Sequence, residues 1–201
     1  EKIKILPPAM NVFSIKKQFS TDKKIVYIGR LAKSKNIELL IKAFSKLKTT
    51  NVNLIIAGPD FGMLKELNKI TKEHGLVDRV HFTGWISEEE KIKLLSETTI
   101  FVHPSLEDVF LLSLLEAAAI GIPCVAFDVE SNSTILEDNK TGIIVKDISS
   151  EGLSQKLDLL LNDNNLYDKI SKNSKLILPK KFNWELTTKI LENFYYDVVK
   201  S

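Results

Sequence analysis

Short apolar runs alternate along the chain with segments in which apolar residues recur every three or four positions. The runs are rich in β-branched and aromatic residues and occupy 25–29, 52–58, 79–82, 99–102, 123–127 and 142–145. Such runs predict strands, and the periodic segments between them predict helices, as in the stripe of Ile37, Leu40, Ile41, Phe44 and Leu47. Strands that alternate with helices pair in parallel through right-handed crossovers. The pattern therefore predicts a doubly wound α/β fold, with a mainly parallel sheet and helices on both faces.

Polar residues mark where several of these helices begin. Asp60 can cap a helix that runs to about Glu73. The sequence at 87–90 fits a capping box that starts the next helix. From Ser150 onward the chain is predicted to be helical. The last helix, at about 184–199, carries an expected packing stripe of Leu186, Ile190, Phe194 and Val198.

The segment 110–120 is predicted to be a buried helix, because its residues are apolar or small apart from Glu116. A buried carboxylate is costly unless it is paired, so Glu116 must meet a basic side chain or a ligand that donates hydrogen bonds. Asp108 precedes this helix, and its simplest role is an N-cap. The two acids would lie roughly 12 Å apart along a helix. That distance is on the scale of a nucleotide sugar between its ribose and its hexose, so the pair can straddle a diphosphate.

Composition narrows the functional classes. The 201 residues, 44% of them hydrophobic, suffice for one well-packed domain, which we place at 23–201 after a linker or N-terminal extension at 1–22. The net charge is +2 and the lysines are scattered, so no nucleic acid partner is expected. The lone Cys124 cannot form an internal disulfide, and no apolar run approaches the roughly 20 residues that span a bilayer. We therefore expect a cytoplasmic protein, and one that is longer in nature because this chain starts without methionine.

Ligands of doubly wound sheets bind outside the carboxyl ends of the strands. This rule selects the loops 29–35, 84–87 and 103–108. In the first loop, Arg30 and Lys35 lie where the next helix begins, a position that disfavours cations unless an anion is bound. They indicate a phosphate site, although each is also compatible with a solvated surface group. In the second loop, Trp85 can face a nucleotide base or simply pack.

Other chemistries lack support in the sequence. His74, His81 and His103 are far apart and lack the spacing of metal ligands, so no metal site is predicted. There is no GxxxxGK[ST] motif for a P-loop and no GxGxxG motif for a dinucleotide site. Ser105 and Ser113 lack the flanking glycines of a nucleophile elbow.

Several motifs together resemble one known family. Ile28-Gly29-Arg30-Leu31 is followed by Lys35, and the acidic positions Asp108 and Glu116 are separated by seven residues. Two further landmarks occur at 139–142 and 182–184. In order and spacing, the region from about 6 to 198 resembles the C-terminal, donor-binding domain of retaining GT-B glycosyltransferases. The resemblance is to the large mannosyl/glucosyltransferase type, glycosyl transferases group 1.

The resemblance implies the Rossmann-like half of a GT-B fold and a role for each matched residue. Arg30 and Lys35 would hold the diphosphate of a UDP-, GDP- or ADP-sugar. Glu116 would hold the ribose hydroxyls, and Asp108 would contact hydroxyls of the transferred sugar. The remaining donor-site residues would be Gly29, Val109, Phe110, Leu111 and Leu112, with backbone N–H groups of the last four facing the ligand. Trp85, a candidate from its loop position alone, completes the predicted donor-site residues. A hexose would pass to a glycan or lipid-linked acceptor with retention, without a metal or cofactor.

The same resemblance places the acceptor on an N-terminal domain of the same protein, which this chain lacks. The fragment alone would then bind a nucleotide sugar without transferring it, and the whole enzyme could work at the inner face of a membrane on a membrane-associated acceptor. Asp108 stands where the family usually has glutamate, and Val109 and Leu111 stand where it often has glycine. Two alternatives remain open: a degenerate nucleotide-sugar-binding or interaction module without turnover, and a nucleotide-sugar epimerase on the same architecture.

Overall fold

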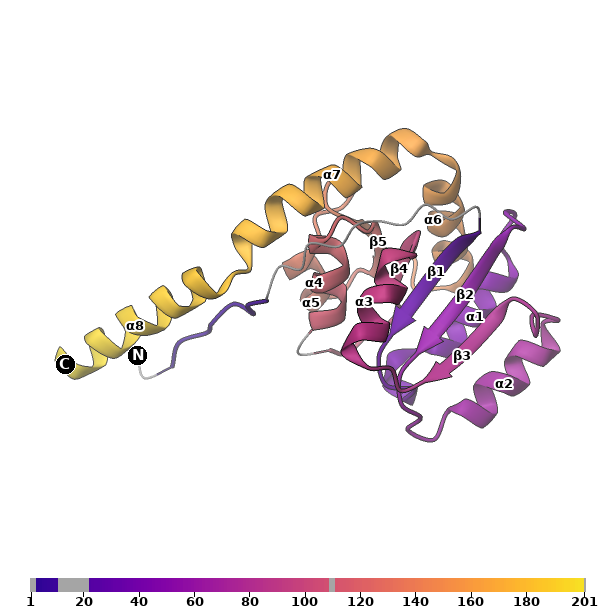
Figure 1. The fold of residues 1–201 in the computed structure, drawn as a ribbon, viewed down its shortest axis with the longest axis horizontal. Helices are drawn as coiled ribbons and strands as arrows, with labels where there is room; N and C mark the ends of the chain where they lie inside the picture. The colour runs from indigo at the N-terminus through magenta and orange to yellow at the C-terminus, as the bar shows by residue number, and fades with distance from the viewer. Residues whose placement is uncertain (1–2, 11–21, 109–110, 201) are drawn as a thin grey trace.

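The computed structural model describes residues 3–10, 22–108 and 111–200 (Figure 1). The strands are β1 (Lys23–Ile28), β2 (Val52–Ala57), β3 (Val80–Gly84), β4 (Ile100–His103), β5 (Cys124–Phe127) and β6 (Ile143–Val145). The helices are the 3-10 turn η1 (Lys33–Lys35), α1 (Ile37–Ser45), α2 (Leu64–Glu73), α3 (Glu88–Ser96), α4 (Leu112–Ala119), α5 (Glu130–Ile135), α6 (Ser150–Asn162), α7 (Asn164–Lys181) and α8 (Trp184–Lys200).

The strands form one six-stranded sheet in the order β3-β2-β1-β4-β5-β6, and every neighbouring pair is parallel. The predicted doubly wound, Rossmann-like α/β fold is therefore confirmed. The chain builds outward from β1 through β2 to β3, then returns to place β4 on the other side of β1. This reversal places the topological switch point between the loops that follow β1 and β4, where such sheets usually bind a ligand, and we call this place the crevice.

The core lies on both faces of the sheet because successive strand residues point to opposite sides. Along β1, Ile25 and Tyr27 join a buried cluster with α1, α2 and α6. Val26 faces the opposite side and joins a second cluster with α4 and the end of α7. The central strands β4 and β5 are buried along their whole length, as expected for parallel strands covered on both faces.

The two ends of the described chain lie together beside the α/β body. Figure 1 shows α8 projecting away from the sheet, with the N-terminal segment running along it. Thr187 Oγ1 donates to the carbonyl oxygen of Pro7 at 3.3 Å. The backbone amide of Met10 donates to the carbonyl oxygen of Phe182 at 3.4 Å. The predicted packing stripe of this helix is wrong in part: Leu186 is 39% exposed and Val198 is 49% exposed.

Several predicted helix boundaries are confirmed and others are corrected. Both halves of the capping box at Ser87 and Glu90 are present. Asp60 accepts hydrogen bonds from the amides that open α2. The buried helix α4 begins at Leu112, and the predicted start at Phe110 lies outside the described residues. The short helix α5 has no counterpart in the prediction, because its sequence ESNSTI has no helical periodicity of apolar residues.

Candidate functional site

The site lies at the carboxyl edge of the sheet, where the parallel strands bring the predicted loops together. Loop 29–35 follows β1 and loop 103–108 follows β4, and these two strands are hydrogen-bonded neighbours. Loop 84–87 follows β3, which is separated from β1 by β2. The first two loops therefore form the two sides of the crevice, and the third lies farther along the same edge.

Close backbone contacts fix the end of β1. The hydroxyl of Tyr27 donates to the carbonyl oxygen of Arg30 at 3.0 Å. A side chain at Gly29 would place its Cβ 2.6 Å from that hydroxyl, so a larger residue here would displace the buried Tyr27 side chain. Directly after the neighbouring strand β2, Gly58 has φ +141° and lies so close that a Cβ would approach the carbonyl oxygen of Gly29 to 1.9 Å. These contacts determine where the backbone of Arg30 enters the crevice.

Arg30 is an exposed cation at this edge. Its guanidinium carbon lies 5.3 Å from the ring centroid of Phe61, which is itself 58% exposed in the loop after β2. A guanidinium over an aromatic face is held weakly, by about 0.5–1 kcal/mol at an exposed site. The side chain is therefore oriented but remains accessible to an anion.

Lys35 and Asp108 join the two sides of the crevice. Lys35 Nζ donates to Asp108 Oδ1 at 2.7 Å, and His103 Nε2 lies 3.1 Å from Asp108 Oδ2. The three side chains are only 9%, 16% and 5% exposed, respectively. Burial alone would raise the pKa of Asp108, but the hydrogen bonds from His103 and Lys35 outweigh it and lower that pKa to about 2. Asp108 is therefore an ionised acceptor at neutral pH.

Local turns hold this cluster in place. Asn36 follows η1 with φ 55°, the left-handed conformation that asparagine tolerates as glycine does, and α1 starts at the next residue. Ser105 Oγ donates to the carbonyl oxygen of Ser34 at 3.3 Å and so ties the β4 loop to η1. The predicted N-cap role of Asp108 is wrong, because Leu111 precedes α4 and no side chain caps it. Asp108 lies before the helix, and its two carboxylate oxygens contact Lys35 and His103 instead.

Glu116 is paired as well, from a different element. Lys91 on α3 lies 3.0 Å from a carboxylate oxygen of Glu116 and 3.0 Å from one of Glu88. The side chains of Lys91 and Glu116 are 17% and 19% exposed. Burial acts to lower the pKa of Lys91, but hydrogen bonds to the two glutamates outweigh it and raise that pKa. Of the two partners predicted for Glu116, a basic side chain or a ligand, the structure provides the basic side chain. The 12 Å separation remains a prediction; it took Asp108 and Glu116 to lie on one helix, and α4 begins at Leu112.

The other predicted positions occupy varied surroundings. Leu111 is buried and Leu112 is 46% exposed at the start of α4. Val109 and Phe110 lie outside the described residues. Trp85 is 72% exposed and lines a hollow of about 290 Å³ beside α3, apart from the Lys35–Asp108 pair.

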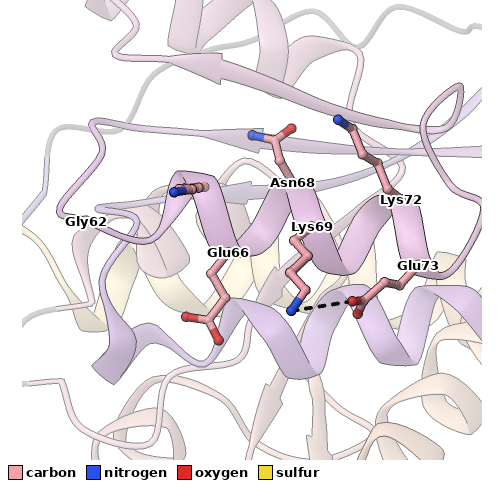
Figure 2. Close-up of a pocket in the computed structure, with 7 residues that line it drawn as sticks. Gly62, Glu66, Asn68, Lys69, Lys72 and Glu73 are labelled. Atoms are coloured by element: carbon pink, nitrogen blue, oxygen red, sulfur yellow. Dashed lines mark ion pairs between the residues drawn. The ribbon is translucent and has the colours of Figure 1, made fainter.

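A hollow of about 850 Å³ runs along α2 and contains none of the predicted residues (Figure 2). Its lining comes from one helix and the turn before it: Gly62, Lys65, Glu66, Asn68, Lys69, Lys72 and Glu73. The ion pair between Lys69 and Glu73 spans 3.7 Å between side chains that are 75% and 58% exposed. Solvated pairs of this kind contribute little, so the hollow is open helix surface and the crevice remains the candidate site.

Residues 11–176 match the family described as Glycosyl transferases group 1. The chain belongs to this family. It is 28% identical over 176 residues to alpha-D-kanosaminyltransferase of Streptomyces kanamyceticus, covering 87% of this chain and 45% of that protein. It is 26% identical over 192 residues to N-acetyl-alpha-D-glucosaminyl L-malate synthase of Bacillus anthracis, covering 92% and 49%. The chain thus spans about half the length of the curated relatives it matches.

A solved structure is also similar in fold. The crystal structure of Anabaena Alr3699/HepE in complex with UDP and glucose has a TM-score of 0.80 and 23% identity, over 87% of this chain and 48% of that one. At this level of identity the likeness establishes the fold. It agrees with the six-stranded parallel sheet described above and with the GT-B resemblance of the motifs.

Two residues of this group 1 domain were not assigned to the site from sequence. Lys91 lies in a charged helix, and no local sequence pattern links it to the site, because its partner Glu116 is 25 residues away. His103 entered the sequence argument only as a rejected metal ligand, and its contact with Asp108 depends on the loop conformation. Within the described residues, no group of three or more His, Cys, Asp or Glu side chains could hold a metal ion, and no helix is long and apolar enough to cross a membrane.

Proposed function

We propose that this chain is the donor-binding domain of a retaining, metal-independent glycosyltransferase that transfers a hexose from a nucleoside diphosphate to a glycan or lipid-linked acceptor. The observation that carries the proposal is the Lys35–Asp108 pair across the β1–β4 crevice, with the exposed Arg30 on the same loop as Lys35. The pair places a cation and a hydrogen-bond acceptor together at the switch point of a doubly wound sheet.

Arg30 and Lys35 supply the charge that such a reaction needs. When the bond between the sugar and the diphosphate breaks, negative charge develops on the leaving nucleoside diphosphate. Fixed cations that face this charge stabilise the transition state more than the bound substrate. In a metal-independent enzyme, these two side chains take the place of a divalent cation.

The acidic residues and α4 supply the remaining contacts. Asp108 and Glu116 keep unshared oxygen lone pairs while bound to lysine, and these can accept hydrogen bonds from sugar hydroxyls. We assign Glu116 to the ribose and Asp108 to the transferred sugar. The first amides of α4, from Leu112 onward, have no partner within the helix and favour an anion such as the diphosphate.

The acceptor is proposed to bind to an N-terminal domain of the same protein. Support comes from the relatives, which are about twice as long as this chain. Support also comes from exposed apolar side chains on α8 and on the N-terminal segment 3–10 beside it. Ile5 is 88% exposed, Trp184 57% and Tyr196 67%. A surface of this kind is typical of an interface.

A binding titration tests the donor site. UDP-glucose, GDP-mannose and ADP-glucose are titrated into the chain, and one of them should bind at millimolar concentration or below. Arg30→Ala and Glu116→Ala should each weaken that binding about tenfold, because each removes a charged hydrogen-bonding group. Lys72→Ala, on the hollow of α2, should leave it unchanged. Absence of binding by all three ligands, or unchanged affinity in both site variants, would reject the assignment.

The full-length protein tests the reaction. NMR of the product should show the anomeric configuration of the donor retained, and EDTA should leave the rate unchanged. Failure of the full-length protein to transfer or hydrolyse any nucleotide sugar that it binds, with activity restored by Asp108→Glu, would instead support the degenerate binding module. An epimerised donor formed without acceptor would identify an epimerase.

A further inference from the structure

His103 is a buried titratable residue to which the proposed reaction gives no role. It is the last residue of β4, where the strand meets loop 103–108. Its side chain is 5% exposed, its Nε2 lies 3.1 Å from Asp108 Oδ2, and its Nδ1 is buried with no hydrogen-bond partner among the described residues. One ring nitrogen contacts the carboxylate and the other has no partner among the described residues. The ring can therefore gain a proton on Nδ1 while Nε2 keeps its contact with Asp108.

The contact fixes which nitrogen carries the proton. Asp108 is ionised and its oxygens only accept, so Nε2 must donate and the neutral ring leaves Nδ1 with a lone pair. Asp108 is then shared between Lys35, from η1, and His103. Among the described residues, Tyr27 and Arg30 also lie at this place: burial raises the pKa of Tyr27, the charge of Asp108 raises it further, and the charge of Arg30 lowers it. With His103 neutral, Lys35 balances the charge of Asp108.

A bound diphosphate changes this balance. It brings two negative charges to the side of Lys35, which then serves both the diphosphate and Asp108. Negative charge added near an imidazole favours its protonated form. An imidazole ordinarily changes charge between pH 5 and 8. The negative charge of a nearby diphosphate can therefore alter the protonation of an imidazole near neutral pH.

We infer that a nucleotide sugar binds to this domain together with a proton, which His103 takes up on Nδ1 to keep Asp108 neutralised when Lys35 turns to the diphosphate. This inference rests on the proposed function. No covalent bond breaks: one proton leaves the solvent, the neutral imidazole becomes imidazolium, and Nε2 keeps its hydrogen bond to Asp108. His103 is thus a positioning residue that makes donor affinity depend on pH.

Calorimetry of the whole chain tests the inference. UDP-glucose, GDP-mannose and ADP-glucose are titrated at pH 7 in buffers of different ionisation enthalpy, which reveals protons taken up on binding. Nucleotide sugars are used because the terminal phosphate of a free nucleoside diphosphate titrates near pH 6 by itself. We expect uptake of up to about one proton, with the dissociation constant rising up to about tenfold per pH unit between pH 6 and 8.

Matched variants separate His103 from other histidines. His103→Gln keeps an N–H donor near the position of Nε2 but cannot take up a proton, so donor binding should persist without uptake. His81→Gln, on an exposed position of β3, should retain the uptake of the parent chain. An NMR titration of the parent chain needs no variant: at pH 7, the His103 ring resonances should shift toward their protonated positions when donor is added.

The outcomes are distinct. Binding without buffer dependence, or uptake that persists in His103→Gln, overturns the inference and leaves the proposed function intact. A ring resonance that does not move on donor binding overturns it as well, even if His103→Gln fails to fold. If none of the three nucleotide sugars binds, the proposed function fails, and the inference fails with it.

Discussion

Replacing Asp108 by asparagine should remove a pH-dependent part of the stability of this domain. In the folded chain, hydrogen bonds from His103 and Lys35 outweigh the effect of burial and lower the pKa of Asp108 from 3.8 to about 2. A pKa that is depressed on folding means that folding favours the ionised carboxylate. The resulting stability is present above the unfolded-state pKa and is lost as the pH falls through the folded-state pKa.

The magnitude follows from the shift. At about 1.4 kcal/mol per pKa unit, the change from 3.8 to about 2 corresponds to roughly 2.5 kcal/mol of unfolding free energy. The Asp108 side chain is only 16% exposed, so solvent screening removes little of this. About half should be lost by pH 3, where the unfolded chain is mostly protonated at this position and the folded chain is not. Asparagine resembles the protonated acid, so Asp108→Asn should lack this slope.

Urea unfolding of the parent chain and of Asp108→Asn at pH 6, 5, 4 and 3 measures the effect, with tryptophan fluorescence and circular dichroism as probes. The stability advantage of the parent chain should shrink by about 1 kcal/mol between pH 6 and 3. Glu107→Gln is the matched control, because this neighbouring acid is exposed, and its difference from the parent chain should stay nearly constant. A constant difference for Asp108→Asn would refute the account of this ion pair.

Two further substitutions test the architecture around the site by urea unfolding at pH 7. Lys91→Met should cost about 1–3 kcal/mol, because it leaves the largely buried Glu116 without its cation, whereas Lys69→Met should cost under about 0.5 kcal/mol because its pair is solvated. Equal costs would show that Glu116 does not depend on this pair. Gly58→Ala should cost about 3 kcal/mol or more, since its Cβ would meet the carbonyl oxygen of Gly29 at 1.9 Å with φ at +141°. A loss below 1 kcal/mol would show that β1 and β2 can separate there.

The sheet could be predicted because its signals are local. Each strand is a short apolar run, and the helical stripes between the runs determine that neighbouring strands are parallel. The capping box at Ser87 is equally local, since its two hydrogen bonds join residues three apart. The helix α5 escaped prediction for the same reason: without an apolar periodicity, its six residues resemble a loop.

The contacts within the site depend on distant residues, and there local reasoning failed. Asp108 has the sequence context of an N-cap, yet its partner Lys35 is 73 residues away. The same holds for the stripe on α8, which has the period of a packed helix although Leu186 and Val198 remain exposed. Periodicity shows that a helix has an apolar side, and it does not show which surface covers that side.

The pairing of both acids with lysines bears on which ligands the crevice can select. A free anion could compete for Lys35, but it would have to draw that lysine from a carboxylate 2.7 Å away and would gain nothing at Glu116. A neutral sugar could donate hydroxyls to the acids, but it would leave Arg30 without an anion. A ligand that carries a diphosphate between two hydroxyl-bearing groups offers charge to the cations and donors to the acids at once. Under the proposed function we therefore expect the ion pairs to favour a nucleotide sugar over either of its parts, because each part alone would disturb a satisfied pair without replacing it.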